Sequence, residues 1–296
     1  MAAGPLLKFD DVWRELAGFT AQFLSVGAAG FWLTARRAAA AKVAGEEERD
    51  WLARATDAAA WHGVVGALAS AALLYLSLEQ RAAEKHLALV AFVGSQPPAA
   101  VAIAFAAVAL VGFLLARARV TVGWWLAMAV LLSPLRGLLT GTPIQRLVNP
   151  VHRLAGALWI GTLFVLVAAG LRPVLASALP AERRARLAKV MVDAFSPLAL
   201  GGFAVLGVMG VIMAWTNLKK LDALWTTPYG FALIVKLVIV AGVVAIGAVN
   251  WRKQKPQLGT LAGAQLLRRS AELELWFATA VLIVTAILIS LPGPGE

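Results

Sequence analysis

Eight long apolar runs constrain this sequence more than any other feature. Each run has about 20 mostly apolar residues, the length that an α-helix needs to cross the core of a bilayer. A backbone in lipid must also satisfy its own hydrogen bonds, which favours helices. We therefore predict an all-α polytopic membrane protein with eight transmembrane helices. The expected helices lie near residues 16–34, 57–77, 98–116, 121–139, 150–178, 188–216, 227–250 and 269–291.

The composition is typical of a protein whose solvent is the bilayer. Hydrophobic residues make up 60% of the chain and charged residues 15%, whereas a soluble domain has about 45–50% and about 25%. The 27 Lys and Arg outnumber the 16 Asp and Glu, but they fall in short loops and not along one amphipathic face. We therefore expect the lipid bilayer, and no nucleic acid, as a partner. The absence of cysteine excludes disulfides, thiolate metal sites and a cysteine nucleophile.

The loop charges predict the orientation of the chain. On one side of the eight expected helices the connecting segments contain 17 Lys and Arg, and on the other side they contain nine. Cytoplasmic loops carry the excess of positive charge in membrane proteins, so the side with 17 is the cytoplasmic side. Both termini then face the periplasm or its equivalent, and we expect a multi-pass protein of the bacterial inner membrane.

Similar stretches in the two halves indicate an internal duplication. Trp124–Leu132 and Leu275–Ile283, in the fourth and eighth expected helices, are identical at five of nine positions. Other matched features are Asp57-Ala58 with Asp193-Ala194, Gly66 with Gly202, and Pro98 with Pro228. Four helices return the chain to its starting side, so the halves 1–149 and 150–296 are predicted to be parallel four-helix repeats.

The second half also carries landmarks in a fixed order across its four expected helices. They are the stretch Val151–Gly161, the stretch Phe195–Ala199, Thr227–Gly230 followed by Lys236, Asn250 before a basic loop, Arg268–Ser270 leading to Glu274, and a final Leu291-Pro292. In order and spacing these landmarks resemble the CopD family of bacterial copper-resistance and copper-uptake membrane proteins. The resemblance covers about half of the chain, and the first half resembles the family only loosely.

The resemblance implies copper transport or copper homeostasis at the inner membrane, often beside a periplasmic copper-binding protein. Cu(I) favours thioether and imidazole ligands. His152 is expected just inside the outer end of the fifth helix, and Met209 and Met213 lie near the outer end of the sixth, one turn apart on one face. These three residues are the candidate metal ligands, at an outer site from which copper would pass inward.

Three further ionisable residues are candidates for a role inside the membrane. Lys236 lies near the middle of the seventh helix, where a lysine costs roughly 2.5–3.5 kcal/mol, and Glu274 of the eighth helix is its expected partner. His62 lies near the inner end of the second helix, where a hydrogen bond to a neighbour would also explain it. Asp57 and Asp193 are expected to open their helices at the inner face and to interact with the helix dipoles.

Two other classes of function remain open. A membrane helix bundle can hold haem between facing histidines, but His62 and His152 are expected roughly 20 Å apart in depth, which leaves a single His, or His with Met, as axial ligand. The scarcity of soft ligands, with five Met and three His, favours an accessory or structural subunit of a larger membrane complex, such as a respiratory one. No phosphate-binding glycine loop, Ser/His/Asp arrangement or zinc spacing is evident, so we expect no enzyme.

Overall fold

The computed structural model describes residues 8–40, 45–139 and 142–293, with the backbone alone for residues 134–139. The described residues form helices and short turns without any strand, which confirms the all-α prediction. Seven helical segments in this part of the chain are long and apolar enough to cross a membrane, and the chain is a multi-pass membrane protein. These segments are Phe9–Ala40, Glu46–Glu84, Pro97–Arg117, Pro143–Ala176, Ala181–Leu218, Pro228–Gln257 and Leu261–Ser290.

Five of the seven crossing segments are single α-helices, and the other two also contain helices of another type. The single helices are α1 (Phe9–Ala40), α2 (Glu46–Glu84), α4 (Pro97–Arg117), α9 (Ala181–Leu218) and α12 (Leu261–Ser290). The fifth predicted run is a rod in which α6 (Pro143–Gly156), α7 (Thr162–Val165) and α8 (Arg172–Ala176) are joined by the π-helical segments η2 (Ala157–Gly161) and η3 (Leu166–Leu171). The last two crossings are α11 (Pro228–Val249), extended by η4 (Asn250–Gln254) and η5 (Lys255–Gln257), and α12 (Leu261–Ser290). Short helices α3 (Leu89–Ser95) and α10 (Ala223–Thr226) lie in two of the loops.

The run predicted at 121–139 differs from the other seven. It forms a short α-helix, α5 (Thr121–Ala127), which continues as a 3₁₀-helix, η1 (Met128–Leu139). Pro134 lies within this segment, and proline has no N–H for the i to i−4 hydrogen bond of an α-helix. The segment therefore does not count among the seven long helices, and the number of eight is not confirmed by length and composition.

A threonine caps the N-terminus of each of three helices. The hydroxyl oxygen of Thr142 accepts a hydrogen bond from the Gln145 backbone N–H, and the Gln145 side chain accepts one from the Thr142 backbone, which makes a capping box at α6. Thr227 and Thr260 cap α11 and α12 in the simpler way, each accepting a backbone N–H three residues later. Each cap satisfies a backbone donor that the helix itself leaves free.

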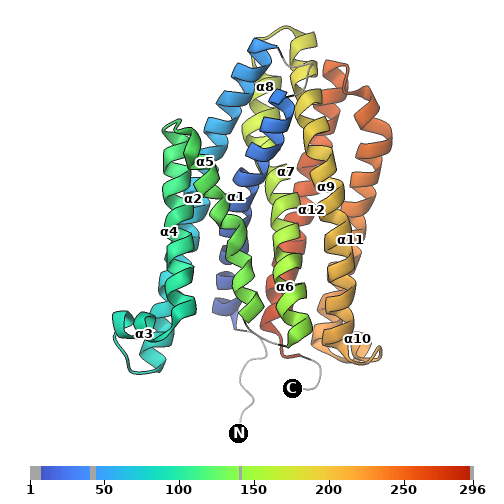
Figure 1. Cartoon of the computed structure of the whole chain (residues 1–296). Coiled ribbons are helices and arrows are strands. Elements are labelled where there is room, and N and C mark those ends of the chain that lie inside the picture. Colours follow the sequence, from blue (N-terminus) through green and yellow to red (C-terminus); the bar gives the residue numbers. More distant parts are fainter. Residues whose placement is uncertain (1–7, 41–44, 140–141, 294–296) are drawn as a thin grey trace.

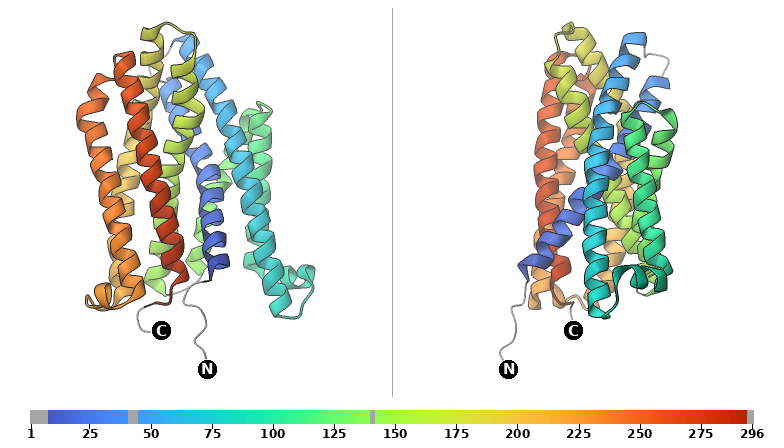
Figure 2. Two further views of the ribbon diagram at one scale, coloured as in Figure 1. Left: turned by 180° about the vertical axis from the view of Figure 1, so that it is seen from behind. Right: turned by 90° about the vertical axis from the view of Figure 1, so that its left-hand side faces the viewer.

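Helix α1 lies inside the bundle and contacts both halves of the chain. It packs on α2, on η2 and α7, and on α9 and α12, and Figures 1 and 2 show it running obliquely past the rod of α6 to α8. Every residue from Ser25 to Gly30 is buried. The stretch is hence surrounded on all sides, as expected of a helix in the interior of a larger bundle.

Glycines make the central crossing possible. A Cβ atom added at Gly27 would overlap the backbone carbonyl of Gly161 in the rod, and one added at Gly161 would overlap the carbonyl oxygen of Phe23. One turn further on, Gly30 leaves space for the Thr162 hydroxyl. Small residues allow backbones in membranes to approach closely, so this crossing has no room for even one methyl group.

We predict that Gly27→Ala destabilises the protein by about 1–3 kcal/mol, because the new methyl group meets backbone and cannot be accommodated by a rotamer change. The readout is the melting temperature of the purified protein in detergent. Gly18→Ala, on the same helix, is the matched control, because a Cβ there has no neighbour within 4 Å. Equal melting temperatures for the two variants would contradict the proposed close crossing.

Candidate functional sites

His152 lies on α6 and faces α9. A Cβ atom added at Gly210 of α9 would be 3.4 Å from Cε1 and 3.8 Å from Nδ1 of the His152 ring, so the imidazole packs against the bare backbone of that helix. The Nδ1 atom is buried and has no hydrogen-bond partner among the described residues. The ring also meets the backbone of Leu206, one turn before Gly210 on α9, and Nδ1 is the ring atom left without a hydrogen bond of ordinary geometry.

The two candidate methionines flank this contact. Met209 precedes Gly210, Met213 follows it by three residues, and both side chains are half-buried on α9. The fold thus brings His152 against the part of α9 that carries the methionines, at the same level of the bundle. Their joint role as metal ligands stays a prediction. In the described part of the chain, His, Asp and Glu side chains form no group of three or more that would hold a metal ion by themselves.

Lys236 lies on α11 and interacts electrostatically with His152. Its side chain is half-buried, and within the described residues no ion pair joins it to Glu274. The expected pairing of Lys236 with Glu274 is therefore not what the structure has. The ionisable side chain that Lys236 influences is His152 of the rod, and Glu274 bonds Asn250 instead.

Glu274 belongs to a separate polar cluster near the other end of the second half. Its carboxylate is buried and accepts a hydrogen bond of 3.2 Å from Nδ2 of Asn250, the first residue of the π-helical segment η4. Oδ1 of Asn250 in turn accepts a hydrogen bond of 2.5 Å from the Ser270 hydroxyl. This chain of three side chains joins the end of α11 to α12. Asn250 and Ser270 appeared among the sequence landmarks, but nothing in the sequence indicated that they contact each other.

His62 is explained by local contacts. Its Nδ1 lies 2.9 Å from the carbonyl oxygen of Ala58, one turn earlier on α2, and its ring packs edge-to-face on Phe164 of α7 at 5.8 Å between centroids. Phe164 is 12 residues beyond His152 on the same rod, so the two histidines are separated by roughly 18 Å along it. The fold does not bring His62 and His152 together as a pair of axial ligands.

Asp57 and Asp193 do not open their helices, contrary to the expectation from the sequence. The helices begin earlier, α2 at Glu46 and α9 at Ala181, because their charged first turns are also helical. Each aspartate forms an ion pair with a basic residue at the far end of the next crossing along the chain. Arg119 lies 2.8 Å from Asp57, and Lys255 lies 3.6 Å from Asp193, which is also paired with Lys189 at 2.6 Å.

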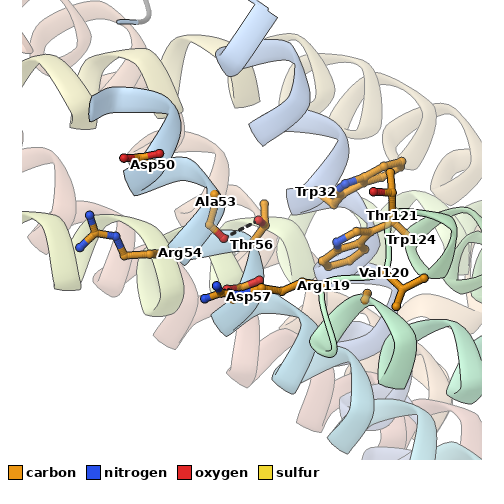
Figure 3. Close-up of a pocket in the computed structure, with 11 residues that line it drawn as sticks. Trp32, Asp50, Ala53, Arg54, Thr56, Asp57, Arg119, Val120, Thr121 and Trp124 are labelled. Atoms are coloured by element: carbon orange, nitrogen blue, oxygen red, sulfur yellow. Dashed lines mark hydrogen bonds and ion pairs between the residues drawn. The ribbon is translucent and has the colours of Figure 1, made fainter. Parts of the chain in front are cut away.

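A cavity of about 540 Å³ lies beside the Asp57 to Arg119 pair (Figure 3). Its opposite wall is formed by Trp32 and Trp124, whose rings stack at 5.5 Å with an interplanar angle of 8°. No His or Met lines this cavity, and its Asp57 carboxylate is already paired with a cation. The cavity therefore lacks the soft ligands that the sequence placed at the outer site.

Comparison with known proteins identifies the second half. Residues 189–288 match the family model described as Copper resistance protein D, the CopD family, which confirms the resemblance seen in the sequence. The match includes Met209, Met213, Lys236 and Glu274 but not His152. Over 150 residues the chain is 29% identical to the Copper transport protein CutJ of Bacillus subtilis (strain 168). That alignment covers 51% of this chain and 26% of the relative, so the similarity spans about a quarter of the relative's length. No solved structure matches the chain.

We predict that Asn250→Leu lowers the free energy of unfolding more than Ser270→Ala does. The first change removes the donor to Glu274 and the acceptor for Ser270 together, and each buried polar group without a partner costs about 1–3 kcal/mol. Ser270→Ala removes only the outer member of the cluster. Melting temperatures in detergent give the comparison, and an Asn250→Leu protein as stable as wild type would show that the cluster does not hold α11 to α12.

Proposed function

We propose that this chain transports copper across the bacterial inner membrane and takes it up at an outer site formed by His152, Met209 and Met213. The CopD match and the relative named as a copper transport protein support copper transport or resistance at a general level. We further propose that transport is directed inward and that a periplasmic copper-binding protein is the donor to this site. We likewise propose a transporter and not an enzyme.

The unpartnered Nδ1 of His152 is the observation that carries this site. A buried nitrogen without a hydrogen bond is unfavourable unless another group occupies it, and a neutral imidazole is a common metal ligand. Nδ1 lies near the backbone at Gly210, a residue without a side chain, and the methionines lie on either side of that glycine in the sequence of α9. A Cu(I) ion is the ligand that suits one imidazole and two thioethers.

Lys236 suits a transport site better than a storage site. Its ammonium group interacts electrostatically with His152, so a copper cation at the imidazole would experience repulsion from α11. Ions cross a membrane protein only where binding is strong enough for capture and weak enough for release. Repulsion by Lys236 would weaken the binding of copper, and we propose that it promotes release of copper from the outer site.

We also propose that α5 and η1 together form an eighth membrane crossing. Figures 1 and 2 show that α1 begins and α12 ends at the same end of the bundle, which requires an even number of crossings. An α-helix rises about 1.5 Å per residue and a 3₁₀-helix about 2.0 Å, so Thr121–Ala127 and Met128–Leu139 together reach roughly 34 Å. The hydrocarbon core is about 30 Å thick, so the two helices together are long enough to cross it.

Equivalent contacts in the two halves support the proposed duplication into residues 1–149 and 150–296. Asp57 and Arg119 are separated from Asp193 and Lys255 by the same interval along the chain, and both pairs are ionic. Gly66 and Gly202, matched in the sequence, also take equivalent places. Gly66 packs α2 on α1, and Gly202 packs α9 on the rod at Trp159.

We expect His152→Ala to abolish copper-dependent accumulation of copper in cells that express the chain, because the only imidazole of the outer site is lost. Met209→Leu combined with Met213→Leu should reduce accumulation by at least tenfold, since both thioethers are replaced by groups of similar volume. Elemental analysis of cells and of the purified protein provides the measurement.

Two variants serve as matched controls for this experiment. His62→Ala removes a histidine that bonds only its own helix, and Met191→Leu alters a buried methionine that packs near Gly170, away from the proposed site. Both should accumulate copper as wild type does. Normal accumulation by a well-folded His152→Ala protein would remove the proposed outer site, whatever the general function of the chain.

The absence of cysteine allows the orientation to be tested directly. Leu87→Cys lies in the loop after α2, and Gly259→Cys lies between η5 and α12, where a Cβ has open space. We predict that a membrane-impermeant maleimide labels Leu87→Cys in intact spheroplasts and labels Gly259→Cys only after permeabilisation. The reverse pattern would invert the proposed topology.

A further inference from the structure

A second cavity, of about 320 Å³, lies in the C-terminal half between the rod, α9, α11 with η4, and α12. The ion pair between Asp193 and Lys255 fixes how α9 and α11 are aligned along it. The lining residues of α9 lie between Val192 and Phe203, and those of α11, η4 and η5 lie between Val243 and Lys255. The two segments are antiparallel. Phe203 and Val243 therefore mark one end of the cavity, and Lys255 marks the other.

The two ends differ in chemistry. At the Phe203 end the wall is apolar, and Trp159 packs edge-to-face on Phe203 at 5.5 Å between ring centroids. At the Lys255 end the lining contains Asn250, Arg252 and Glu274. The cavity thus has an apolar body and one polar end that carries cations and a hydrogen-bond acceptor.

Two of the polar groups are free to bind a ligand. Arg252 is exposed and, among the described residues, forms no ion pair. Asn250 bonds one carboxylate oxygen of Glu274, Oε2, while the other, Oε1, lies on the side of Gly247. A Cβ added at Gly247 would meet only this oxygen, at 3.9 Å. Oε1 thus lies beside the bare backbone of Gly247, and both residues line the cavity.

The lining does not suit copper. It contains no His, Met or Cys, so it lacks the ligands that Cu(I) prefers. Basic pockets between transmembrane helices are instead suited to the phosphate of a lipid headgroup, and apolar walls are suited to an acyl chain. Charge and shape both favour an amphipathic anion.

We propose that this cavity is a binding site for one phospholipid molecule of the phosphatidylglycerol type. Its phosphate lies at Arg252, its acyl chain lies along Trp159 and Phe203, and the headgroup hydroxyls donate to Oε1 of Glu274. Phosphatidylcholine has the same phosphate and chains but a headgroup that carries no hydrogen-bond donor and a compensating positive charge. The site therefore distinguishes these two lipids.

The test uses the full chain, purified in detergent and depleted of lipid. Phosphatidylglycerol or phosphatidylcholine with identical acyl chains is added, and lipid binding is measured by native mass spectrometry together with the melting temperature. We expect one bound phosphatidylglycerol per chain, a rise in melting temperature of about 5 °C, and at least tenfold weaker binding of phosphatidylcholine. Equal binding of both lipids, or no binding by wild type, would overturn the proposal.

Two glycine variants test the location of the lipid. Gly247→Leu fills the cavity, whereas Gly201→Leu places the same side chain on α9 where a Cβ has no neighbour within 4 Å and which does not line the cavity. Binding should be lost in the first variant and kept in the second. Arg252→Gln, at an exposed position that leaves packing unchanged, should weaken phosphatidylglycerol binding about tenfold. Unchanged binding in Gly247→Leu and Arg252→Gln would place the lipid elsewhere.

Discussion

The close crossing of α1 and the rod at Gly27 and Gly161 is the contact on which the rest of the structure depends. In a bilayer, apolar side chains gain little by leaving lipid for a protein interior, so helices associate through close packing and polar contacts. Here the backbones themselves meet. This contact joins the first helix of each proposed half, and α1 thereby also reaches α9 and α12. The position of the rod, and with it of His152, follows from this crossing.

The polar groups inside the bundle fall into two kinds. Asp57 and Asp193 are paired with basic residues at the end of the next crossing, and Oε2 of Glu274 accepts a hydrogen bond from Asn250, which in turn accepts one from Ser270, so these contacts join helices to one another. His152 differs because its Nδ1 has no partner in the described chain and its electrostatic neighbour is a cation. An arrangement that is unfavourable in the absence of a ligand is what a binding site requires, whereas satisfied groups are what a scaffold requires.

Sequence reasoning identified the crossings because length and apolarity alone decide them. It placed the start of α9 seven residues too late, since helices continue beyond the membrane in charged turns such as Ala181–Arg186 that carry no apolar signal. Counting residues along the helices also predicted that His152 and the two methionines lie at one level of the membrane. In the structure His152 packs against Gly210, which lies between the methionines in the sequence. The expected partner of Lys236 was wrong because Glu274 is placed beside Asn250 and Ser270, and this contact between the end of α11 and α12 had no signal in the sequence. The π-helical segments that rotate the rod, η2 and η3, have no sequence signature at all.

The distribution of these groups between the halves bears on how such a chain works. The ion pair from the second helix of each half, and the glycine that packs this helix on the first, occur in both halves. The counterparts of Met209 and Met213, by contrast, are Leu73 and Ser77, and the first half offers no equivalent of Lys236 or of the Glu274 cluster. Duplicated contacts are therefore structural, and the contacts found once are the candidates for chemistry. On this argument the first half supports the second through α1, and the proposed copper site and the proposed lipid site both lie in the C-terminal half, near opposite ends of α9.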